Sequence, residues 1–280
     1  MNLILQGLHT ELSTVERIAA LTGARRLTAI TPFAYRCEQV DSTAAVKTQV
    51  EAECLAAQLD CTWLATDLRL SEFKLVAMDM DSTLITIECI DEIADMQGLK
   101  PQVAAITEAA MRGEIEFPES LARRVALLKG LDASALQSVY QERVKLSPGA
   151  QNMLDAVRRA GLKTLLVSGG FTFFTDRIKQ RLGLDYSHAN VLEIADGKLT
   201  GKVIGTVVDA DEKKRTLERV CAEIGIAPDQ AIVMGDGAND LRMMSIAGMS
   251  VAFRAKPLVR AQADVALNFV GLDGILPLFK

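Results

Sequence analysis

The chain has 280 residues and a formal net charge of −5 at pH 7, and 49% of its residues are hydrophobic. This length suits one large domain or a medium-sized domain with attachments. Lysine and arginine residues are dispersed, so we expect no nucleic-acid partner. No apolar run approaches the ~20 residues that cross a membrane, and the N-terminus lacks the pattern of a secretory signal. We therefore expect no membrane partner. The five cysteines show no CxxC spacing, which favours reduced thiols in a cytoplasmic protein.

The first 70 residues have the pattern of a small α+β unit. Short apolar runs that predict strands alternate with longer segments whose apolar residues recur at helical spacing. We expect strands and helices in the order βαββαβ, at residues 3–8, 13–22, 26–33, 34–40, 43–59 and 62–66. Ser13 is the expected N-cap of the first helix. This order is typical of a split-βαβ, or ferredoxin-like, unit.

A larger α/β unit follows, and helices interrupt it directly after its first strand. Apolar runs at 73–78, 162–167 and 231–234 have the length and composition of buried strands. From Glu88 to Leu146 we expect no strand and four amphipathic helices, at residues 89–97, 103–112, 119–128 and 134–144. From Gly149 onward, strands and helices are expected to alternate. The predicted fold class is therefore α/β, with a Rossmann-like, doubly wound and mostly parallel sheet.

This pattern divides the chain into three expected domains. Residues 1–70 form an N-terminal α+β domain, residues 71–87 and 149–280 form the α/β core, and residues 88–148 form a helical cap. A cap inserted in this way is expected to act as a lid that excludes water from the site until it closes.

Acidic and hydroxyl side chains follow several of the expected core strands. Asp79 and Asp81 come after the first run, Ser168 after the second and Asp236 after the third. In an open α/β sheet, ligands bind at the carboxyl ends of the strands, whereas unpaired carboxylates in a packed core are costly. The pattern therefore favours a site for phosphate and a metal ion at this edge of the sheet.

The pair Asp79 and Asp81 suits covalent phosphate chemistry. A carboxylate can attack phosphorus and form an aspartyl phosphate, which divides a difficult hydrolysis into two easier steps. In extended backbone, a residue two positions further on points to the same side, so Asp81 can act as general acid and base. An isolated pair of this kind can equally be a solvated loop, but the buried strand before it and the hydroxyls of Ser82 and Thr83 after it favour the site.

A carboxylate and a phosphate need a counter-charge, which magnesium supplies because it binds oxygen ligands. Asp236 is expected to be a further carboxylate ligand, and Asp240 either ligates through water or braces the loop. Gly235 and Gly237 allow the backbone to approach closely. A plain Gly-Asp turn is the alternative interpretation of this segment.

Phosphate contacts are expected from a serine and a lysine. Ser168 and the amides of Gly169 and Gly170 would form a phosphate cradle at a helix start, although a simple turn also explains these residues. Lys213 would neutralise phosphate charge in the transition state, and on chemistry alone Lys214 is an equal candidate. An ordinary surface position is the alternative for either lysine.

Four segments in this order, at 79–83, Ser168, Lys213 and 235–240, resemble the motifs of the haloacid dehalogenase superfamily of phosphohydrolases. The resemblance covers roughly residues 73–280, and within the superfamily the sequence is most similar to the phosphoserine phosphatases. The further residues that carry this similarity are Glu88, Ile90 to Ala94, Phe117, Ser120, Leu121, Arg124, Val125, Leu127 to Lys129 and Val167 to Phe171. It implies magnesium-dependent hydrolysis of O-phospho-L-serine to L-serine and phosphate, the last step of L-serine biosynthesis.

The resemblance also implies roles for the catalytic residues. Asp79 would be the nucleophile that forms the aspartyl phosphate, and Asp81 would be the general acid and base. Magnesium would be held by the Asp79 side chain, the Asp81 backbone carbonyl and the Asp236 side chain. Ser168 and Lys213 would hold the phosphate group.

Substrate selection is implied for residues of the cap and the core edge. Glu88 would meet the substrate ammonium, and Arg124 would take the carboxylate, which suits a bidentate guanidinium. Phe117 would help to close the site, and Gly169 and Asn239 would complete the contacts. Without the resemblance, a Glu and an Arg on a helical insertion are interpreted as solvated surface residues. Together they complement a zwitterionic amino acid, which favours phosphoserine over sugar phosphates.

The N-terminal domain is similar in its element order to the ACT type of amino-acid-sensing domain. That similarity implies L-serine feedback or formation of a homodimer, and a purely structural appendage is the alternative. Two other functions remain open for the whole chain. One is a phosphotransferase that passes the phosphate from Asp79 to an alcohol such as homoserine instead of water. The other is a non-catalytic amino-acid sensor, against which the complete set of motif residues argues.

Overall fold

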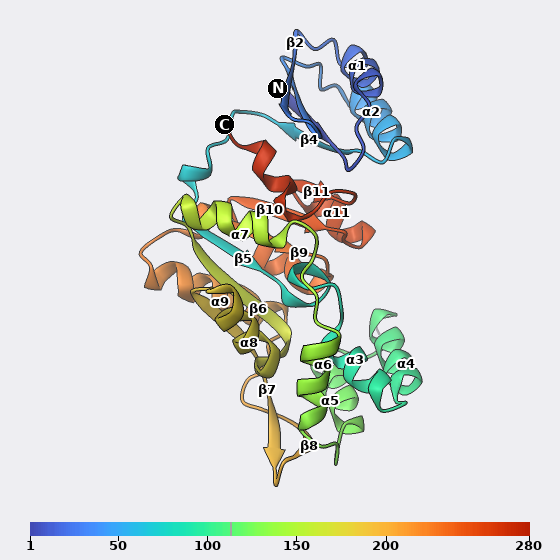
Figure 1. Ribbon diagram of the computed structural model, residues 1–280, viewed down its shortest axis with the longest axis vertical. Coiled ribbons are helices and arrows are strands. Elements are labelled where there is room, and N and C mark those ends of the chain that lie inside the picture. Colours follow the sequence, from blue (N-terminus) through green and yellow to red (C-terminus); the bar gives the residue numbers. More distant parts are fainter. Residues whose placement is uncertain (113) are drawn as a thin grey trace.

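The computed structural model describes residues 1–112 and 114–280. Three parts follow one another along its longest axis: an N-terminal sheet with two helices, a central sheet between helices, and a group of helices at the opposite end (Figure 1). Within the described residues, none of the helices has both the length and the apolar character to span a bilayer.

The N-terminal part is a four-stranded sheet with two helices. Its elements are β1 (Asn2–Gln6), α1 (Leu12–Leu21), β2 (Arg26–Thr31), β3 (Ala34–Glu38), α2 (Ala44–Ala56) and β4 (Asp60–Leu64). The strand order is β2-β3-β1-β4, and all neighbours are antiparallel. The predicted βαββαβ order is confirmed. The expected Ser13 cap is wrong, because α1 already begins at Leu12 and Glu11 occupies the N-cap position.

The central part is a seven-stranded sheet with the order β11-β10-β9-β5-β6-β7-β8. Its strands are β5 (Leu75–Met78), β6 (Lys163–Phe171), β7 (Tyr186–Ala195), β8 (Lys198–Ile204), β9 (Ala231–Gly235), β10 (Met249–Phe253) and β11 (Val265–Leu267). All neighbours are parallel except β7 and β8. The predicted α/β class with a mostly parallel, Rossmann-like sheet is confirmed.

Helices cover both faces of this sheet. They are α7 (Ala150–Arg159), α8 (Thr172–Leu182), α9 (Ala210–Glu223), α10 (Leu241–Met244) and α11 (Pro257–Gln262). Alternate residues of β5 enter different apolar clusters, because successive side chains of a strand point to opposite faces. Leu75 and Ala77 join the cluster that contains Leu217 of α9, whereas Val76 and Met78 join the one that contains helix α7. This burial on both faces explains the continuous apolar runs in the sequence.

Shorter helical turns connect these elements. They are the turns η1 (Leu70–Glu72), η2 (Met80–Leu84), η3 (Pro228–Gln230), η4 (Ala238–Asp240) and η5 (Leu272–Leu278). Two of them, η2 and η4, follow strands β5 and β9 directly. Asp81 and Asp240 lie within these turns, and Asp79 and Asp236 lie in the short links between the strands and the turns.

The helical group at the far end contains α3 (Cys89–Met96), α4 (Lys100–Met111), α5 (Phe117–Leu127) and α6 (Ser134–Glu142). These positions agree with the four helices expected from Glu88 to Leu146. The hairpin of β7 and β8 reaches this group and lies beside α5 (Figure 1). Its tip is tied to the cap by backbone hydrogen bonds from Gly130 N to Leu199 O and from Ala133 N to Gly197 O, both 2.8 Å long. The expectation of strict strand–helix alternation after Gly149 is therefore wrong, because two consecutive strands form this antiparallel arm.

Candidate active site

The acidic residues meet because β5 and β9 are parallel neighbours in register. Met78 lies opposite Met234, so the residues that follow both strands leave the sheet at the same edge. The amide of Asp79 extends the ladder by donating to Met234 O at 3.0 Å. Asp236 follows Gly235, the last residue of β9. The site therefore lies at the carboxyl ends of the central strands, as the sequence predicts.

Asp79 is almost completely buried, with 5% of its surface exposed, and both of its oxygens are held. Oδ1 accepts a hydrogen bond from Met80 N at 2.7 Å, and Oδ2 accepts one from Lys213 Nζ at 2.9 Å. Burial and the charge of Asp240 raise the pKa of Asp79 well above its usual value, and Lys213 opposes this shift. Such a fixed carboxylate needs little rearrangement before it reacts.

Lys213 has no exposed surface, and its ammonium lies between two carboxylates. It donates to Asp240 Oδ1 at 2.8 Å as well as to Asp79. Burial favours the neutral amine, but the charges and hydrogen bonds of Asp240 and Asp79 raise its pKa above the usual value. Lys214, in contrast, pairs with Glu218 at 3.8 Å and leaves 38% of its side chain exposed. The structure thus brings Lys213 into the site and leaves Lys214 outside it.

Asp240 braces the loop, which is one of its two expected roles. Its Oδ1 accepts from Lys213, and its Oδ2 accepts from the amide of Gly237 at 3.1 Å. It also lies against Gly235, where a Cβ atom would come within 2.3 Å of Asp240 Oδ2. Asn239, the other predicted residue of this turn, packs against Gly237, where a Cβ atom would lie 2.1 Å from Asn239 Oδ1.

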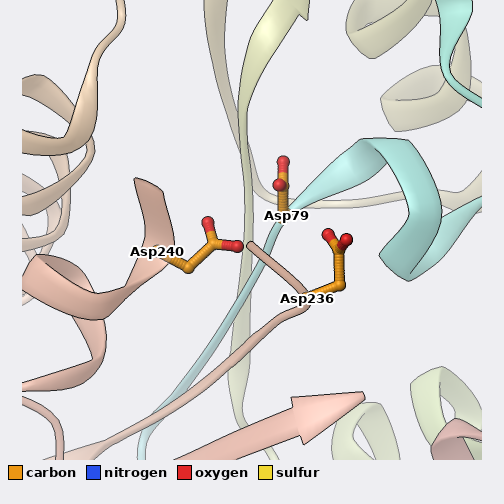
Figure 2. A group of neighbouring side chains, drawn as sticks. All are labelled: Asp79, Asp236 and Asp240. Atoms are coloured by element: carbon orange, nitrogen blue, oxygen red, sulfur yellow. The ribbon is translucent and has the colours of Figure 1, made fainter. Parts of the chain in front are cut away.

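Three carboxylates at this edge could hold a divalent metal ion. Oxygen atoms of Asp79, Asp236 and Asp240 all lie within 4.8 Å of one another (Figure 2). Burial and the charges of Asp240 and Glu88 raise the pKa of Asp236 to about 6, so the cluster holds more negative charge than its surroundings stabilise. Hard divalent cations prefer such oxygen donors. Asp79 and Asp240 already accept short hydrogen bonds or ion pairs on both of their oxygens, whereas Asp236 accepts one long hydrogen bond, from Thr83 Oγ1 at 3.4 Å, and is the least engaged of the three.

The side chains of Asp81 and Ser168 both lie beside Gly170, at the place that a side chain on this residue would fill. A Cβ atom on Gly170 would lie 2.7 Å from Asp81 Oδ2 and 3.0 Å from Ser168 Oγ. Asp81 has extended backbone angles, and its Oδ1 accepts from Cys89 N at 3.3 Å. Burial, together with the charge of Glu88, raises the pKa of Asp81 to about 7. A carboxyl group with this pKa can both give and take a proton near neutral pH.

The phosphate cradle differs from its prediction. Ser168 to Gly170 do not begin a helix, because β6 continues to Phe171 and α8 starts at Thr172. The amide of Gly170 donates to Ser168 Oγ at 2.9 Å, so it is engaged within the turn. The Ser168 hydroxyl proton remains as a donor toward a ligand.

The predicted recognition residues lie on the cap side of the same space. Glu88 accepts a hydrogen bond from Ser82 Oγ at 2.7 Å, and desolvation by neighbouring protein atoms raises its pKa although its side chain stays exposed. Arg124 is half-buried and donates to Ser120 O at 3.4 Å. Burial lowers the pKa of its guanidinium, while the charges of Asp91, Glu88 and Asp81 act in the opposite direction. Among the described residues, no carboxylate lies within ion-pairing distance of Arg124.

Phe117 stands at the first position of α5 and meets the core at the site. A Cβ atom on Gly169 would lie 3.0 Å from Phe117 Cζ.

Two residues near the site were missed by reasoning from the sequence. Asn190 on β7 contacts Gly169 O at 2.8 Å, and the amide of Lys256 donates to Asp236 O at 3.2 Å. For Asn190, the only indication in the sequence was a lone Asn in a strand. For Lys256, the sequence contains no indication.

The sequence matches the family of haloacid dehalogenase-like hydrolases over residues 73–248. A protein from Polaromonas sp. named phosphoserine phosphatase is 59% identical over 219 residues, which are 76% of this chain and 93% of that protein. The crystal structure of a probable phosphoserine phosphatase from Vibrio cholerae, in unliganded form, has a TM-score of 0.84 and 35% identity, and the alignment covers 99% of this chain and 85% of that one. A substrate-bound phosphoserine phosphatase complex has a TM-score of 0.70 and 39% identity, over 74% of this chain and 99% of that one.

The family match covers more than half of the chain, and it includes the segments after β5, β6 and β9 that form the site. The chain therefore belongs to the haloacid dehalogenase-like hydrolases. Within that family, its identity to the Polaromonas protein over almost the whole of that protein places it among the phosphoserine phosphatases.

Proposed function

We propose that this chain is a phosphatase that hydrolyses O-phospho-L-serine to L-serine and phosphate through an aspartyl phosphate on Asp79. The observation that carries the proposal is the pairing of a fixed, buried carboxylate with a second one of suitable pKa. Asp79 is held by Lys213, and Asp81, whose pKa is raised to about 7, faces Ser168 across Gly170. Two carboxyl groups with such different surroundings suit two different roles in one reaction.

In the first step, an Asp79 oxygen attacks phosphorus, and the bond between phosphorus and the seryl oxygen breaks. Asp81 donates its proton to the departing seryl oxygen, which leaves as the hydroxyl of L-serine. Asp81 becomes a carboxylate, and Asp79 carries the phosphoryl group. Lys213 and Ser168 hold the phosphoryl oxygens with N–H and O–H donors, which stabilises the charge that develops there.

In the second step, water attacks the phosphorus of the aspartyl phosphate. Asp81 now acts as the base and takes a proton from this water, so both residues return to their starting states. The bond between phosphorus and the Asp79 oxygen breaks, inorganic phosphate leaves, and Asp79 is again a carboxylate. Asp81 gives one proton to the seryl oxygen in the first step and takes another from water in the second, so one residue serves both steps.

We propose Mg²⁺ as the metal ion, held by the Asp79 side chain, the Asp81 backbone carbonyl and the Asp236 side chain. When bound, it supplies positive charge that lets an anionic carboxylate approach an anionic phosphate. The all-oxygen donor set and the raised pKa of Asp236 support this assignment. Thr83 Oγ1 donates to Asp236 Oδ1 at 3.4 Å and orients that ligand.

The amino-acid part of the substrate is proposed to lie between the core and the cap. Glu88 would bind the ammonium and Arg124 the carboxylate, with Phe117 over the substrate and Gly169 and Asn239 at its sides. The half-buried guanidinium of Arg124 supports this role, since desolvated charge pairs more strongly with a bidentate carboxylate. The names of the relatives support phosphoserine as the substrate.

For residues 1–70 we propose an ACT-like domain that binds L-serine as feedback inhibitor or forms a homodimer, with the core at 71–87 and 149–280 and the cap at 88–148. The exposed strand β2 at one edge of the N-terminal sheet supports a role in association. All five cysteines are free, which supports a reaction in the reducing cytoplasm.

Phosphate release tests the proposed function. Purified protein is given O-phospho-L-serine with and without magnesium, beside phosphothreonine, glycerol phosphate and glucose 6-phosphate. We expect magnesium-dependent release that strongly favours phosphoserine. Equal release from all substrates would contradict the roles of Glu88 and Arg124. Release of phosphohomoserine when homoserine is added would contradict water as the acceptor.

A further inference from the structure

Strands β6 and β7 lose their register beside the site. Val167 lies opposite His188 and Phe171 lies opposite Asn190, so four residue steps on β6 face two on β7. Such a bulge lifts residues out of the ladder and leaves their backbone groups without the usual partner. The residues lifted out are Ser168, Gly169 and Gly170, which face the proposed phosphate position.

The side chain of Asn190 takes the place of the missing ladder partner. It is 1% exposed, and both of its polar atoms are engaged. Its Nδ2 donates to Gly169 O at 2.8 Å, and its Oδ1 accepts from Val208 N at 2.8 Å. One buried amide group therefore ties the bulge in β6 to the segment that precedes α9.

That segment determines where Lys213 stands. Asp209 caps α9 by accepting from Glu212 N at 2.8 Å, and its carbonyl accepts from Lys213 N at 2.9 Å. Lys213 then reaches the nucleophile through its own side chain. Val208 is directly before Asp209, so the hydrogen bond to Asn190 fixes the start of this chain of contacts.

We infer that Asn190 is a positioning residue that sets the spacing between the two phosphate-binding elements, the bulge at Ser168 to Gly170 and the start of α9 with Lys213. It acts through Gly169 and Val208 and does not touch the phosphate itself. The inference rests on the proposed function in taking these elements as the phosphate site. A misplacement of about 1 Å between such elements costs on the order of 100-fold in rate.

Two variants and a matched control test this role. Asn190→Asp keeps the shape and the acceptor for Val208 but replaces the donor to Gly169 O by an oxygen, and Asn190→Ala removes both contacts. Thr164→Val is the control, because Thr164 Oγ1 ties the other end of the same two strands to Asp185 through hydrogen bonds of 3.0 Å. The measurements are thermal stability, KM and kcat with phosphoserine and with p-nitrophenyl phosphate, and calorimetric binding of inorganic phosphate with magnesium present.

We expect both Asn190 variants to weaken phosphate binding by about tenfold or more and to raise KM equally for the two substrates, since the shared phosphate group is affected. Thr164→Val should lose stability and keep the phosphate affinity of the wild type. Phosphate affinity within about threefold of the wild type in a folded Asn190 variant would overturn the inference, as would an equal loss in the control. If one variant does not fold, the other decides. A wild type that binds phosphate but does not hydrolyse phosphoserine would sink the proposed function, and phosphate binding would still decide the role of Asn190.

Discussion

The core side and the cap side of the site are built in different ways. On the core side, Asp79 and Lys213 are buried, and each of their polar atoms has a short hydrogen bond or ion pair to a fixed partner. On the cap side, Glu88 is exposed and accepts one hydrogen bond, from the Ser82 hydroxyl, and Arg124 is half-buried with one long hydrogen bond. Preorganised groups suit the charge changes of a transition state, whereas less constrained groups suit the capture of a substrate. The difference supports our proposal that the chemistry belongs to the core and the choice of substrate to the cap.

Among substitutions on the core side, Asp79→Asn should cause the largest loss of activity. An amide is a poor nucleophile and a poor metal ligand, so we expect kcat to fall by about 10⁴-fold or more. Phosphate release under saturating phosphoserine measures this loss, and circular dichroism checks that the variant is folded. Hydrolysis at the rate of the wild type would remove Asp79 from the nucleophile role.

Removal of the buried ammonium should destabilise the protein. Lys213→Met leaves Asp79 and Asp240 close together without a counter-charge, and breaking such a buried pair costs about 3–5 kcal/mol. The neighbouring variant Lys214→Met should change the free energy of unfolding by less than about 0.5 kcal/mol, because Lys214 is half-exposed. Chemical denaturation of both variants gives the comparison, and equal effects would contradict the buried pairing.

Arg124→Ala tests the proposed role of the cap side in substrate recognition. We expect KM for phosphoserine to rise by about 10- to 100-fold, which corresponds to a charge-assisted bidentate contact. KM for phosphoethanolamine, which lacks the carboxylate, should change little. Arg123→Ala is the matched control, because Arg123 points to Glu119 on the exposed side of the same helix. The same rise for both substrates would take Arg124 out of carboxylate recognition.

The last prediction concerns the pH dependence of stability in the metal-free protein. The folded pKa values of Asp236 and Asp81 are raised to about 6 and about 7, above the unfolded value of about 3.9. The folded state therefore binds these protons more tightly, and the stability that they contribute is complete below pH ~4 and is lost as pH rises through 6 and 7.

Between pH 5 and pH 8, the metal-free protein should therefore lose on the order of 2 kcal/mol for each of these groups. Thermal unfolding at both pH values measures the loss. Magnesium should restore stability at pH 8, and Asp236→Asn should flatten the pH dependence. A metal-free protein that becomes more stable over this range, with no difference in Asp236→Asn, would contradict the crowded cluster.

Prediction from the sequence was most complete for site residues that follow a buried strand. Asp79 and Asp236 could be placed together because parallel strands in register end at one edge, and the apolar runs of β5 and β9 were unambiguous. The full burial of Lys213 between two carboxylates could not be foreseen, because the sequence shows neither the depth of α9 nor its angle. The same limit explains why Lys213 and Lys214 were equal on chemistry alone.

The errors arose where tertiary contacts override local pattern. Ser168 to Gly170 were expected to start a helix, but the bulge in β6 carries them, and only the partner strand reveals the bulge. The arm of β7 and β8 was missed because the sequence does not show that its tip contacts the cap. Asn190 was missed for a related reason, since its two partners lie on segments far from it in the sequence.

The most direct test of the division between core and cap is to trap the phosphoryl group. Wild type and Arg124→Ala are mixed with radiolabelled phosphoserine and magnesium, quenched rapidly in acid, and mapped by peptide mass spectrometry. We predict the label on Asp79 in both proteins, with the variant needing more substrate to reach the same labelled fraction. A label on another residue, or none in the wild type during turnover, would contradict the account.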